Sequence, residues 1–391
     1  MREQVDKADR IERFIQGQRQ DMLDTLETLV TFETPSKRPA KQKQILTYLQ
    51  RNLDKLEFYT FYQPGSKTGG YLYSRPKNRL KSRPVQLLVG HADTVWEENT
   101  LNNMPYEEKD TKVSGPGVFD MKAGLTQIIY ALKTLKELKL QASLTPVILI
   151  NTDEETGSNE STHAIARLAR IANRAFILEP PLGPEGHLKT QRKGVGRFTL
   201  TVEGKAAHAG LDPESGANAI VELSHQIRQL YDLNDPEKGI TVNIGMISGG
   251  VSANVVAPES SAVIDVRVND KKDGEEITRK IKSLQPHFRG TKLIIEGGIG
   301  RQPMTATERN QSLWKAAREK GDLLGMDLKQ GKAGGGSDGN TTSLYTATLD
   351  GLGTPGDGAH APHEYIHKSD LVKRTALLTL LLLEPPLNRK S

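Results

Sequence analysis

The stretch Val85-Gln-Leu-Leu-Val-Gly-His91-Ala-Asp93 decides the fold class of this chain. Its first five residues form a short, largely apolar run that ends at Gly90, which is the pattern of a buried strand. A histidine follows at the point where the strand stops. Open α/β sheets place their functional sites at the carboxyl ends of their strands, so we expect His91 to lie at such a site.

Two further apolar runs follow along the chain, at residues 147–150 and 175–178. Apolar side chains at three- and four-residue spacing predict helices around these runs, at residues 21–32, 41–56 and 124–138. Strands that alternate with helices imply an α/β layer with a mixed, largely parallel sheet.

The sequence changes character after Lys193. Alternating apolar and polar residues predict strands at residues 197–202, 241–247, 262–268 and 292–296, and helices are predicted at residues 218–231 and 275–284. The order β-α-β-β-α-β is that of a ferredoxin-like α+β unit. We therefore expect a catalytic domain made of residues 1–193 and 307–391, with residues 194–306 inserted in it as a second domain.

Composition narrows the class of protein. A chain of 391 residues favours two domains. The net charge is +5, but 53 basic residues are nearly matched by 48 acidic ones and are scattered, so we expect no nucleic-acid partner. The densest basic cluster, residues 75–83, is typical of a solvated loop before a strand. A mild positive bias suits an anionic substrate instead.

Cysteine usage and hydropathy set further limits. The chain has no cysteine, so a metal must be held by histidine and carboxylate side chains. The longest apolar run, residues 376–383, is too short to span a bilayer. Residues 1–20 lack the apolar segment of a signal peptide. We expect a cytoplasmic protein with no membrane partner.

Ligand-type side chains recur in five separated segments. Each segment alone has a structural interpretation: a turn, a helix cap or an acidic loop. Asp93 lies two residues after His91, where its side chain can fix the tautomer of the imidazole. The others are Asp120 in a glycine-rich loop, the adjacent pair Glu154 and Glu155 after the second apolar run, Glu179 after the third, and His360.

The five segments in this order resemble the M20 family of zinc peptidases and amidohydrolases, most closely its glutamate-carboxypeptidase-like branch. The segments are Gly-His91-Ala-Asp-Thr-Val, Gly-Val-Phe-Asp120-Met-Lys, Thr-Asp-Glu154-Glu155-Thr-Gly, Phe-Ile-Leu-Glu179-Pro and Gly-Ala-His360-Ala-Pro-His-Glu-Tyr. The resemblance covers nearly the whole chain. It implies a zinc-peptidase-type catalytic domain, and an inserted domain that acts as a lid and forms a homodimer.

The resemblance also implies a ligand set for two Zn²⁺ ions per subunit. Asp120 would be shared, His91 and Glu179 would serve one ion, and Glu155 and His360 the other. Glu154 would be the general base, and the peptide bond Asp120–Met121 would be cis. Oxygen and nitrogen ligands also admit Co²⁺ or Mn²⁺. His363 stands where the family more often has Asn, which leaves open whether it replaces or assists His360.

The inserted domain carries polar residues that match other family motifs. By resemblance, His208 reaches across the dimer and steadies the oxyanion, while Asn254 and Arg267 hold a substrate carboxylate. An ion pair between Asp265 and Arg267 on the strand surface is the alternative. The loop Gly334-Gly335-Gly336-Ser337-Asp338-Gly-Asn340 lacks the Lys-Ser/Thr of a phosphate-binding loop. It resembles the family's loop beside that carboxylate, through Gly335, Gly336 and Ser337.

The resulting expectation is a two-zinc hydrolase that cleaves the amide bond to a C-terminal amino acid with a free carboxylate. Its substrate would be a small peptide or an N-acyl amino acid. An N-acyl-amino-acid deacylase or an aminopeptidase-type relative would share all five segments. An alternative of another class is a non-catalytic, metal-dependent binding protein.

Overall fold

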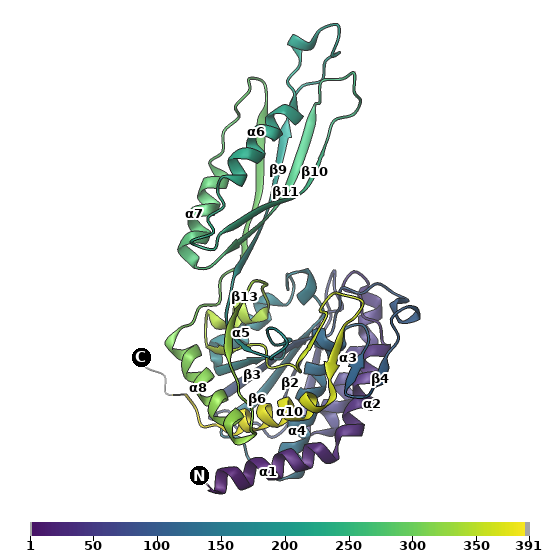
Figure 1. Ribbon diagram of the computed structural model, residues 1–391, viewed down its shortest axis with the longest axis vertical. Helices are drawn as coiled ribbons and strands as arrows, with labels where there is room; N and C mark the ends of the chain where they lie inside the picture. Colours follow the sequence, from purple (N-terminus) through teal and green to yellow (C-terminus); the bar gives the residue numbers. More distant parts are fainter. Residues whose placement is uncertain (1, 388–391) are drawn as a thin grey trace. The chain divides into compact units, whose positions relative to one another are not determined.

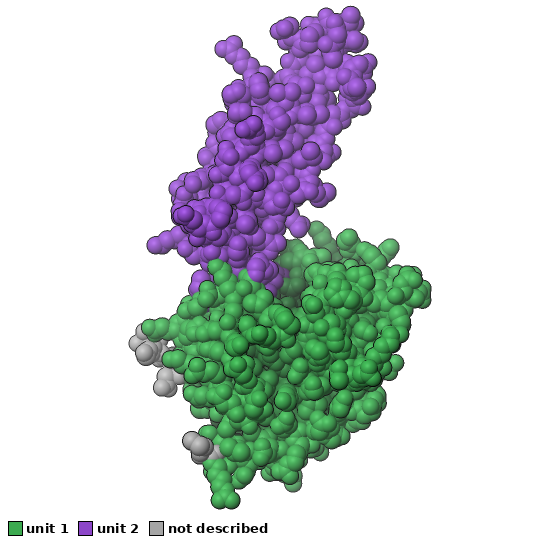
Figure 2. All heavy atoms as spheres, in the orientation of Figure 1, with its two compact units in different colours: residues 1–191, 306–333, 337–391 green, residues 192–305, 334–336 purple. Residues whose placement is uncertain are grey.

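The computed structural model describes residues 2–387, which form two compact units. Unit 1 comprises residues 1–191, 306–333 and 337–391, and unit 2 comprises residues 192–305 and 334–336 (Figure 2). The expected boundaries, 193/194 and 306/307, differ from these by one or two residues. The three glycines at 334–336 are assigned to unit 2, although their chain neighbours belong to unit 1.

Unit 1 is built on a six-stranded sheet in the order β1-β2-β6-β3-β7-β14 (Figure 1). Strands β3 (Val85–His91), β6 (Thr145–Asn151), β7 (Ala172–Ile177) and β14 (Ala347–Leu349) are parallel. Strand β2 (Tyr71–Pro76) is antiparallel to them, and β1 (Phe58–Gln63) pairs with β2 in an antiparallel hairpin. The prediction of a mixed, largely parallel sheet is confirmed.

Both faces of the central strands are buried, which explains why they read as continuous apolar runs. In β3, Leu88 contributes to one core, whereas Leu87 and Val89 contribute to another on the opposite face. The first core includes residues of α2 (Arg19–Thr31), α3 (Pro39–Lys55), α4 (Ala123–Glu137) and α10 (Lys368–Leu383). The second includes residues of α5 (Thr162–Ile171).

Several elements of unit 1 were not predicted from the sequence. Helix α1 (Arg2–Gly17) packs on α10, and α8 (Glu308–Leu323) and α9 (Asp338–Ser343) complete the helices. A small sheet joins β15 (Gly356–Asp357), β16 (Tyr365–His367), β5 (Lys112–Ser114) and β4 (Glu107–Lys109). Strand β8 (Leu188–Arg192) pairs with β13 (Gln330–Ala333).

Unit 2 is the predicted β-α-β-β-α-β arrangement. Its elements are β9 (Gly194–Glu203), α6 (Ala219–Tyr231), β10 (Thr241–Gly249), β11 (Glu259–Val268), α7 (Lys271–Lys282) and β12 (Lys292–Arg301). The strands form an antiparallel sheet in the order β10-β11-β9-β12, which leaves β10 and β12 at its edges. Alternate side chains of β9 and β11 meet the apolar faces of α6 and α7 in one core. Within residues 2–387, no helix is both long and apolar enough to cross a bilayer.

Candidate metal centre

The carboxyl ends of three parallel strands bring the ligand-type residues of unit 1 together. His91 is the last residue of β3, and Glu179 lies two residues beyond the end of β7. Glu154 and Glu155 form a short 3-10 turn that follows β6. Because neighbouring parallel strands end at the same edge of a sheet, these side chains gather there. Asp120 and His360 reach the same place from loops.

Two clusters of metal-type ligands share Asp120. The first contains His91, Asp120 and Glu179, and the second contains Asp120, Glu155 and His360. In each cluster, one ligand atom per residue lies within 4.8 Å of the others. His91 Nε2 is 3.1 Å from Asp120 Oδ1 and 3.5 Å from Glu179 Oε1.

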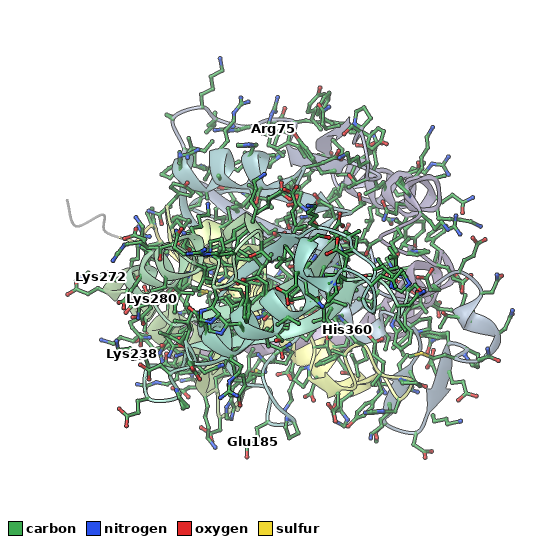
Figure 3. The ribbon with its side chains drawn as sticks, turned by 90° about the horizontal axis from the view of Figure 1, so that it is seen from above. Arg75, Glu185, Lys238, Lys272, Lys280 and His360 are labelled. Atoms are coloured by element: carbon green, nitrogen blue, oxygen red, sulfur yellow. The ribbon has the colours of Figure 1, made fainter. Side chains whose placement is uncertain are left out.

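The second oxygen of Asp120 faces the second cluster. His360 Nε2 lies 3.5 Å from Asp120 Oδ2 and 3.2 Å from Glu155 Oε2. Figure 3 marks His360, whose side chain is half exposed. His363 is exposed and belongs to neither cluster, so the geometry favours His360 as the ligand. The peptide bond Asp120–Met121 is cis, as predicted.

The charges of the clusters require compensation by positive charge. Burial raises the pKa of Glu155 to about 7, although a hydrogen bond with His360 opposes this shift. Hydrogen bonds with Asp120 and Glu155 raise the pKa of His360 to about 10. Burial lowers the pKa of His91, but the nearby carboxylates of Asp120, Asp93 and Glu179 outweigh burial and raise it well above its usual value. Carboxylates packed this closely suit divalent cations.

One buried oxygen provides a separate test of whether a metal fits. Glu155 Oε1 is buried and has no hydrogen-bond partner among the described residues. An unsatisfied buried carboxylate oxygen is costly, and a cation would satisfy it. With three protein ligands in each cluster, the donor set matches that of catalytic zinc sites, which keep one position open.

Asp93 organises the site in a different way from that expected. His91 Nδ1 lies 2.9 Å from the backbone carbonyl of Asp93 and 3.5 Å from its carboxylate. The carbonyl therefore takes the hydrogen bond that was predicted for the carboxylate. The carboxylate instead accepts hydrogen bonds from Ser36 Oγ at 2.8 Å and from the amides of Glu154 and Glu155, each at 3.3 Å. Asp93 thus ties the end of β3 to the turn after β6.

Glu364 is a site residue for which no role was predicted. Its buried carboxylate accepts hydrogen bonds from Trp96 Nε1 at 2.8 Å and from the amides of Gly117, Phe119 and Asp120 at 2.9, 2.9 and 3.0 Å. Burial raises the pKa of Glu364, and these hydrogen bonds oppose the shift. Glu364 therefore positions the loop that carries the shared ligand. Its place four residues after His360, inside a quoted motif, was the available signal.

Two other buried carboxylates hold the acidic turn. Asp153 accepts hydrogen bonds from the amide of Glu160 at 2.8 Å and from Ser161 Oγ at 2.6 Å. Asp338 accepts from Ser158 Oγ at 2.5 Å and from Asn151 Nδ2 at 2.8 Å. The turn that bears Glu154 and Glu155 is therefore fixed on both sides. Asp338 lies in the quoted glycine loop, but no pattern in the sequence assigns it this role.

The candidate residues of unit 2 have partners of their own. His208 Nδ1 accepts hydrogen bonds from the amides of Gly210 and Leu211 at 3.1 and 3.2 Å, so the proton of the neutral ring is on Nε2. Arg267 donates to both oxygens of Asp265, at 2.7 and 3.0 Å. This is the ion pair that the sequence left open as an alternative. Asn254 is exposed, and its Oδ1 accepts a hydrogen bond from Ser252 Oγ at 2.7 Å.

The residues of the glycine loop have two structural roles: the glycine carbonyls bind Arg192, and Ser337 caps a helix. The carbonyls of Gly335 and Gly336 accept hydrogen bonds from Arg192 Nη1 at 3.1 and 3.2 Å. The Ser337 side chain is fully buried, donates to Asp350 Oδ2 at 2.6 Å and accepts from the amide of Gly339 at 2.9 Å. Ser337 therefore caps α9. Its hydroxyl is committed to this cap.

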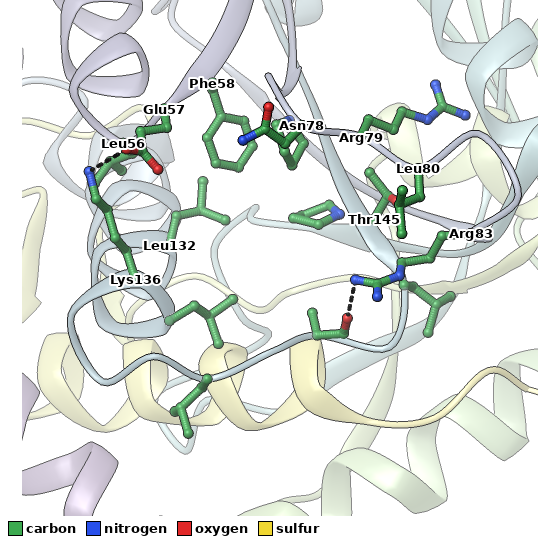
Figure 4. A pocket seen from close by; sticks show the side chains of 16 residues that line it. Leu56, Glu57, Phe58, Asn78, Arg79, Leu80, Arg83, Leu132, Lys136 and Thr145 are labelled. Atoms are coloured by element: carbon green, nitrogen blue, oxygen red, sulfur yellow. Dashed lines mark hydrogen bonds and ion pairs between the residues drawn. The ribbon is translucent and has the colours of Figure 1, made fainter.

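A separate hollow lies at the opposite ends of these strands, where β3 and β6 begin. It has a volume of about 310 Å³, and Figure 4 shows its lining. Thr145 begins β6, and Arg83 lies two residues before β3 begins. Because His91 ends β3, this hollow is not the site of the clustered ligands.

Comparison with known proteins agrees with the geometry. A model of peptidase family M20/M25/M40 matches residues 87–384, which include every ligand of both clusters. The chain belongs to the M20 peptidase family. It is therefore a hydrolase of a metallopeptidase and amidohydrolase family. The recognition made from the five segments is confirmed.

Individual M20 relatives differ in their activities. Carboxypeptidase G2 of Pseudomonas sp. (strain RS-16) is 28% identical over 374 residues, which cover 93% of this chain and 89% of the relative. Acetylornithine deacetylase of Proteus mirabilis is 28% identical over 253 residues, covering 60% and 62%. The structure of aminopeptidase PepT from Bacillus cereus superposes with a TM-score of 0.77 at 21% identity, covering 93% of this chain and 98% of that one.

Proposed function

We propose that this M20 hydrolase is a two-zinc exopeptidase that releases a C-terminal amino acid from a small peptide or an N-acyl amino acid. The observation that carries the proposal is the position of Asp120. Its two carboxylate oxygens face His91 at 3.1 Å and His360 at 3.5 Å, and each histidine belongs to a separate cluster of three ligands. One carboxylate that faces two ligand clusters suits a pair of cations about 3.5–4 Å apart.

The residues fit zinc by their chemistry. His91 and Glu179 would complete one site with Asp120, and His360 and Glu155 would complete the other. Bound divalent cations would supply polarisation of the scissile carbonyl and acidification of water. Co²⁺ and Mn²⁺ remain compatible with the same oxygen and nitrogen donors.

Glu154 is the proposed general base. It neighbours Glu155 in the turn after β6, and Asp93 accepts a hydrogen bond from its backbone amide at 3.3 Å. In the proposed reaction, the carboxylate of Glu154 accepts a proton from the attacking water. It then gives this proton to the leaving amine, which departs as the free amino group of the released residue.

The proposed substrate clamp belongs to unit 2. The guanidinium of Arg267 is planar and would bind the α-carboxylate of the substrate through two hydrogen bonds, with Asp265 holding it in orientation. Asn254 and the backbone amides of Gly335 and Gly336 would add donors. Ser337 is left out of the clamp because its hydroxyl is buried in the cap of α9. Glutamate is the first candidate for the released residue, by analogy with carboxypeptidase G2.

We also propose that unit 2 forms a homodimer, and that His208 acts in the site of the partner subunit. Edge strand β10 and the loop after it expose large apolar side chains: Met246 is 68% exposed, Ile247 68% and Val251 71%. Exposed apolar residues along the open edge of a sheet mark an interface. Because Nδ1 of His208 is occupied by backbone amides, Nε2–H remains to donate to an oxyanion.

A second candidate function is the removal of an N-acyl group from an amino acid. It is favoured by the acetylornithine deacetylase relative and requires the same ligands and the same base. The two candidates differ in the acyl side of the scissile bond: a peptide or aroyl group for the exopeptidase, and an acetyl-sized group for the deacylase.

A substrate panel tests the proposal. It would contain α- and γ-linked glutamyl peptides, N-aroyl glutamates, N-acetyl amino acids and matched C-terminal carboxamides, each assayed with and without added zinc. Zinc-dependent release of a C-terminal amino acid by the wild type, lost in Glu154→Gln, is the expected result. Preference for N-acetyl amino acids would select the deacylase. No turnover of any member, with two metals bound, would favour a metal-dependent binding protein.

A further inference from the structure

Arg374 in α10 is a buried cation with few partners. Its side chain is 2% exposed, and Nη2 donates a hydrogen bond to the backbone carbonyl of Gly186. Its Nε and Nη1 atoms are buried and have no hydrogen-bond partner among the described residues. Each unsatisfied buried donor destabilises a fold, because it has lost its hydrogen bonds to water. The guanidinium therefore presents at least two donors that the described part of the chain does not use.

A second buried arginine in the same unit shows what a satisfied guanidinium looks like. Arg174 is 0% exposed and donates to Gln86 Oε1 from Nε at 3.0 Å and from Nη2 at 2.8 Å. Its remaining bonds go to backbone carbonyls, those of Leu381, Glu384 and Pro385. Unit 1 can thus satisfy every nitrogen of a buried arginine, yet it does not do so for Arg374.

The charge of Arg374 is also uncompensated by ion pairing. Within residues 2–387, it forms no ion pair within 4.0 Å. Burial lowers the pKa of Arg374 to about 10, and Asp370, one helical turn earlier, opposes this shift. The group therefore remains a cation at neutral pH. A buried charge without a counter-ion is strongly destabilising, so both the charge and the free donors call for an acceptor that carries negative charge.

We propose that Nε and Nη1 of Arg374 bind a small inorganic monoanion of the halide class, with chloride as the physiological example. A monoanion matches the single positive charge, and a small one suits a side chain that is almost fully enclosed. A halide accepts hydrogen bonds from several donors at once. Water would satisfy the donors but would leave the charge unbalanced, so the anion is the better occupant.

The place of Arg374 gives this anion a structural consequence. A side-chain carbon at Gly186 would meet Arg374 Nη2 at 2.5 Å and Pro355 at 2.9 Å, so these three residues are packed together. The amide of Gly353 donates to the carbonyl of Glu179 at 2.8 Å. The anion would therefore stabilise the two segments that follow Glu179 and precede His360. This inference does not depend on the proposed substrate or on the metal.

Thermal unfolding tests the inference in solution. The melting temperature of the metal-free full-length protein would be measured in sodium chloride and in sodium gluconate at equal ionic strength. For the wild type, chloride is expected to raise it by about 2–4 °C more than gluconate does. Arg374→Met should remove this difference. Arg174→Met is the matched control: it loses a buried arginine and stability, but it should retain the chloride effect.

A bromide-soaked crystal of the wild type provides the structural test, and it holds even if Arg374→Met fails to fold. An anomalous scattering peak within hydrogen-bond distance of Nε and Nη1, together with the chloride-dependent stability, is the expected result. A water molecule at that position, with no bromide signal, would overturn the proposal. So would a bromide peak without any chloride effect on stability, because it would indicate an adventitious ion only.

Discussion

Glu364 holds Asp120 by its backbone: Glu364 Oε1 accepts the amide hydrogen of Asp120 at 3.0 Å, and Asp120 is the ligand that both clusters share. The same carboxylate also binds the amides of Gly117 and Phe119. A single buried side chain thus fixes the loop that presents the shared carboxylate to both histidines. Residues that orient metal ligands in this way affect metal affinity although they do not touch the metal.

Glu364→Gln is therefore expected to impair metal binding. Each oxygen of Glu364 accepts two hydrogen bonds, so the amide NH₂ of glutamine would face a pair of donors. We expect a loss of about 2–3 kcal/mol in the free energy of unfolding and a decrease of about 10–100-fold in zinc affinity. Urea denaturation and metal titration measure the two effects. Glu319→Gln, on an exposed face of α8, should change neither; equal effects there would contradict the assignment.

The sequence predicted the frame of the fold because its decisive strands are buried on both faces. Runs such as residues 85–89 and 147–150 cannot alternate with polar residues when a core covers each side, and they are therefore visible without the structure. Helix α1 escaped prediction because only Ala8, Ile11 and Ile15 are buried, a stripe too narrow to stand out among charged residues. Strands of two or three residues, such as β15 and β16, carry no periodicity to read.

The sequence was less informative about how the site is supported. Ligands at strand ends follow from the topology, so His91, Glu155 and Glu179 could be placed together. Supporting bonds depend on side-chain directions that only the folded chain defines. This is why the carbonyl of Asp93, and not its carboxylate, accepts from His91, and why Ser337 caps a helix. Glu364 and Asp338 lie within motifs that the sequence shows, but the sequence does not show that their carboxylates accept several hydrogen bonds.

Glu154 and Glu155 are adjacent, but substitutions at the two positions should have different effects on activity and on metal content. Glu154→Gln is expected to lower kcat by about 10²–10⁴-fold with two metals still bound, because it removes only the general base. Glu155→Gln should lower the metal content, since Glu155 belongs to one of the ligand clusters. Kinetics and metal analysis on the same preparations separate the two roles. A Glu154→Gln protein that binds one metal instead of two would assign Glu154 to the ligand set.

Arg267→Lys should weaken recognition of the substrate carboxylate. Lysine keeps the charge but lacks the planar guanidinium, which can donate to Asp265 through Nε and Nη2 and still offer a pair of donors to the substrate. For substrates with a free α-carboxylate, we expect kcat/KM to fall by about 10–100-fold, mainly through KM. Carboxamide analogues should change little. Arg279→Lys, on the exposed face of α7, is the control. An equal loss for carboxamides would show that Arg267 acts on something other than the carboxylate.

Glu160 is expected to make the free energy of unfolding depend on pH in the acidic range. It accepts hydrogen bonds from the amide of Lys67 at 2.8 Å and from Thr68 Oγ1 at 2.6 Å, and it also accepts from Ser66. Burial raises its pKa, but the hydrogen bonds outweigh burial and lower the pKa from 4.5 to about 2. A depressed carboxyl pKa contributes stability above the unfolded value, and this contribution is lost as the pH falls toward the folded value.

The expected result is a difference in unfolding free energy between wild type and Glu160→Gln that is constant above about pH 5. This difference should shrink between pH 4.5 and about 2, the two pKa values of Glu160. Urea denaturation of the metal-free proteins at a series of pH values measures it. Using metal-free protein keeps metal loss in acid from contributing. A difference that does not vary with pH would show that Glu160 acts through packing, not through its charge.

His208 allows the dimer and its role in catalysis to be tested together. If His208 serves the partner's site, a heterodimer of Glu154→Gln and His208→Ala chains has one complete site, formed by Glu154 of one chain and His208 of the other. Co-expression of the two chains should then restore about a quarter of wild-type activity, since half of the dimers are mixed and each has one working site. Each variant alone should be nearly inactive, with its metals bound. If His208 acts within its own subunit, no mixed dimer holds a complete site, and co-expression restores nothing.

Purification through two different tags, one on each chain, isolates the heterodimer for the measurement. The His208 side chain is exposed, and its only described hydrogen bonds are local ones, from the amides of Gly210 and Leu211 to Nδ1. The alanine variant should therefore keep its fold, so that a loss of activity reports on the site.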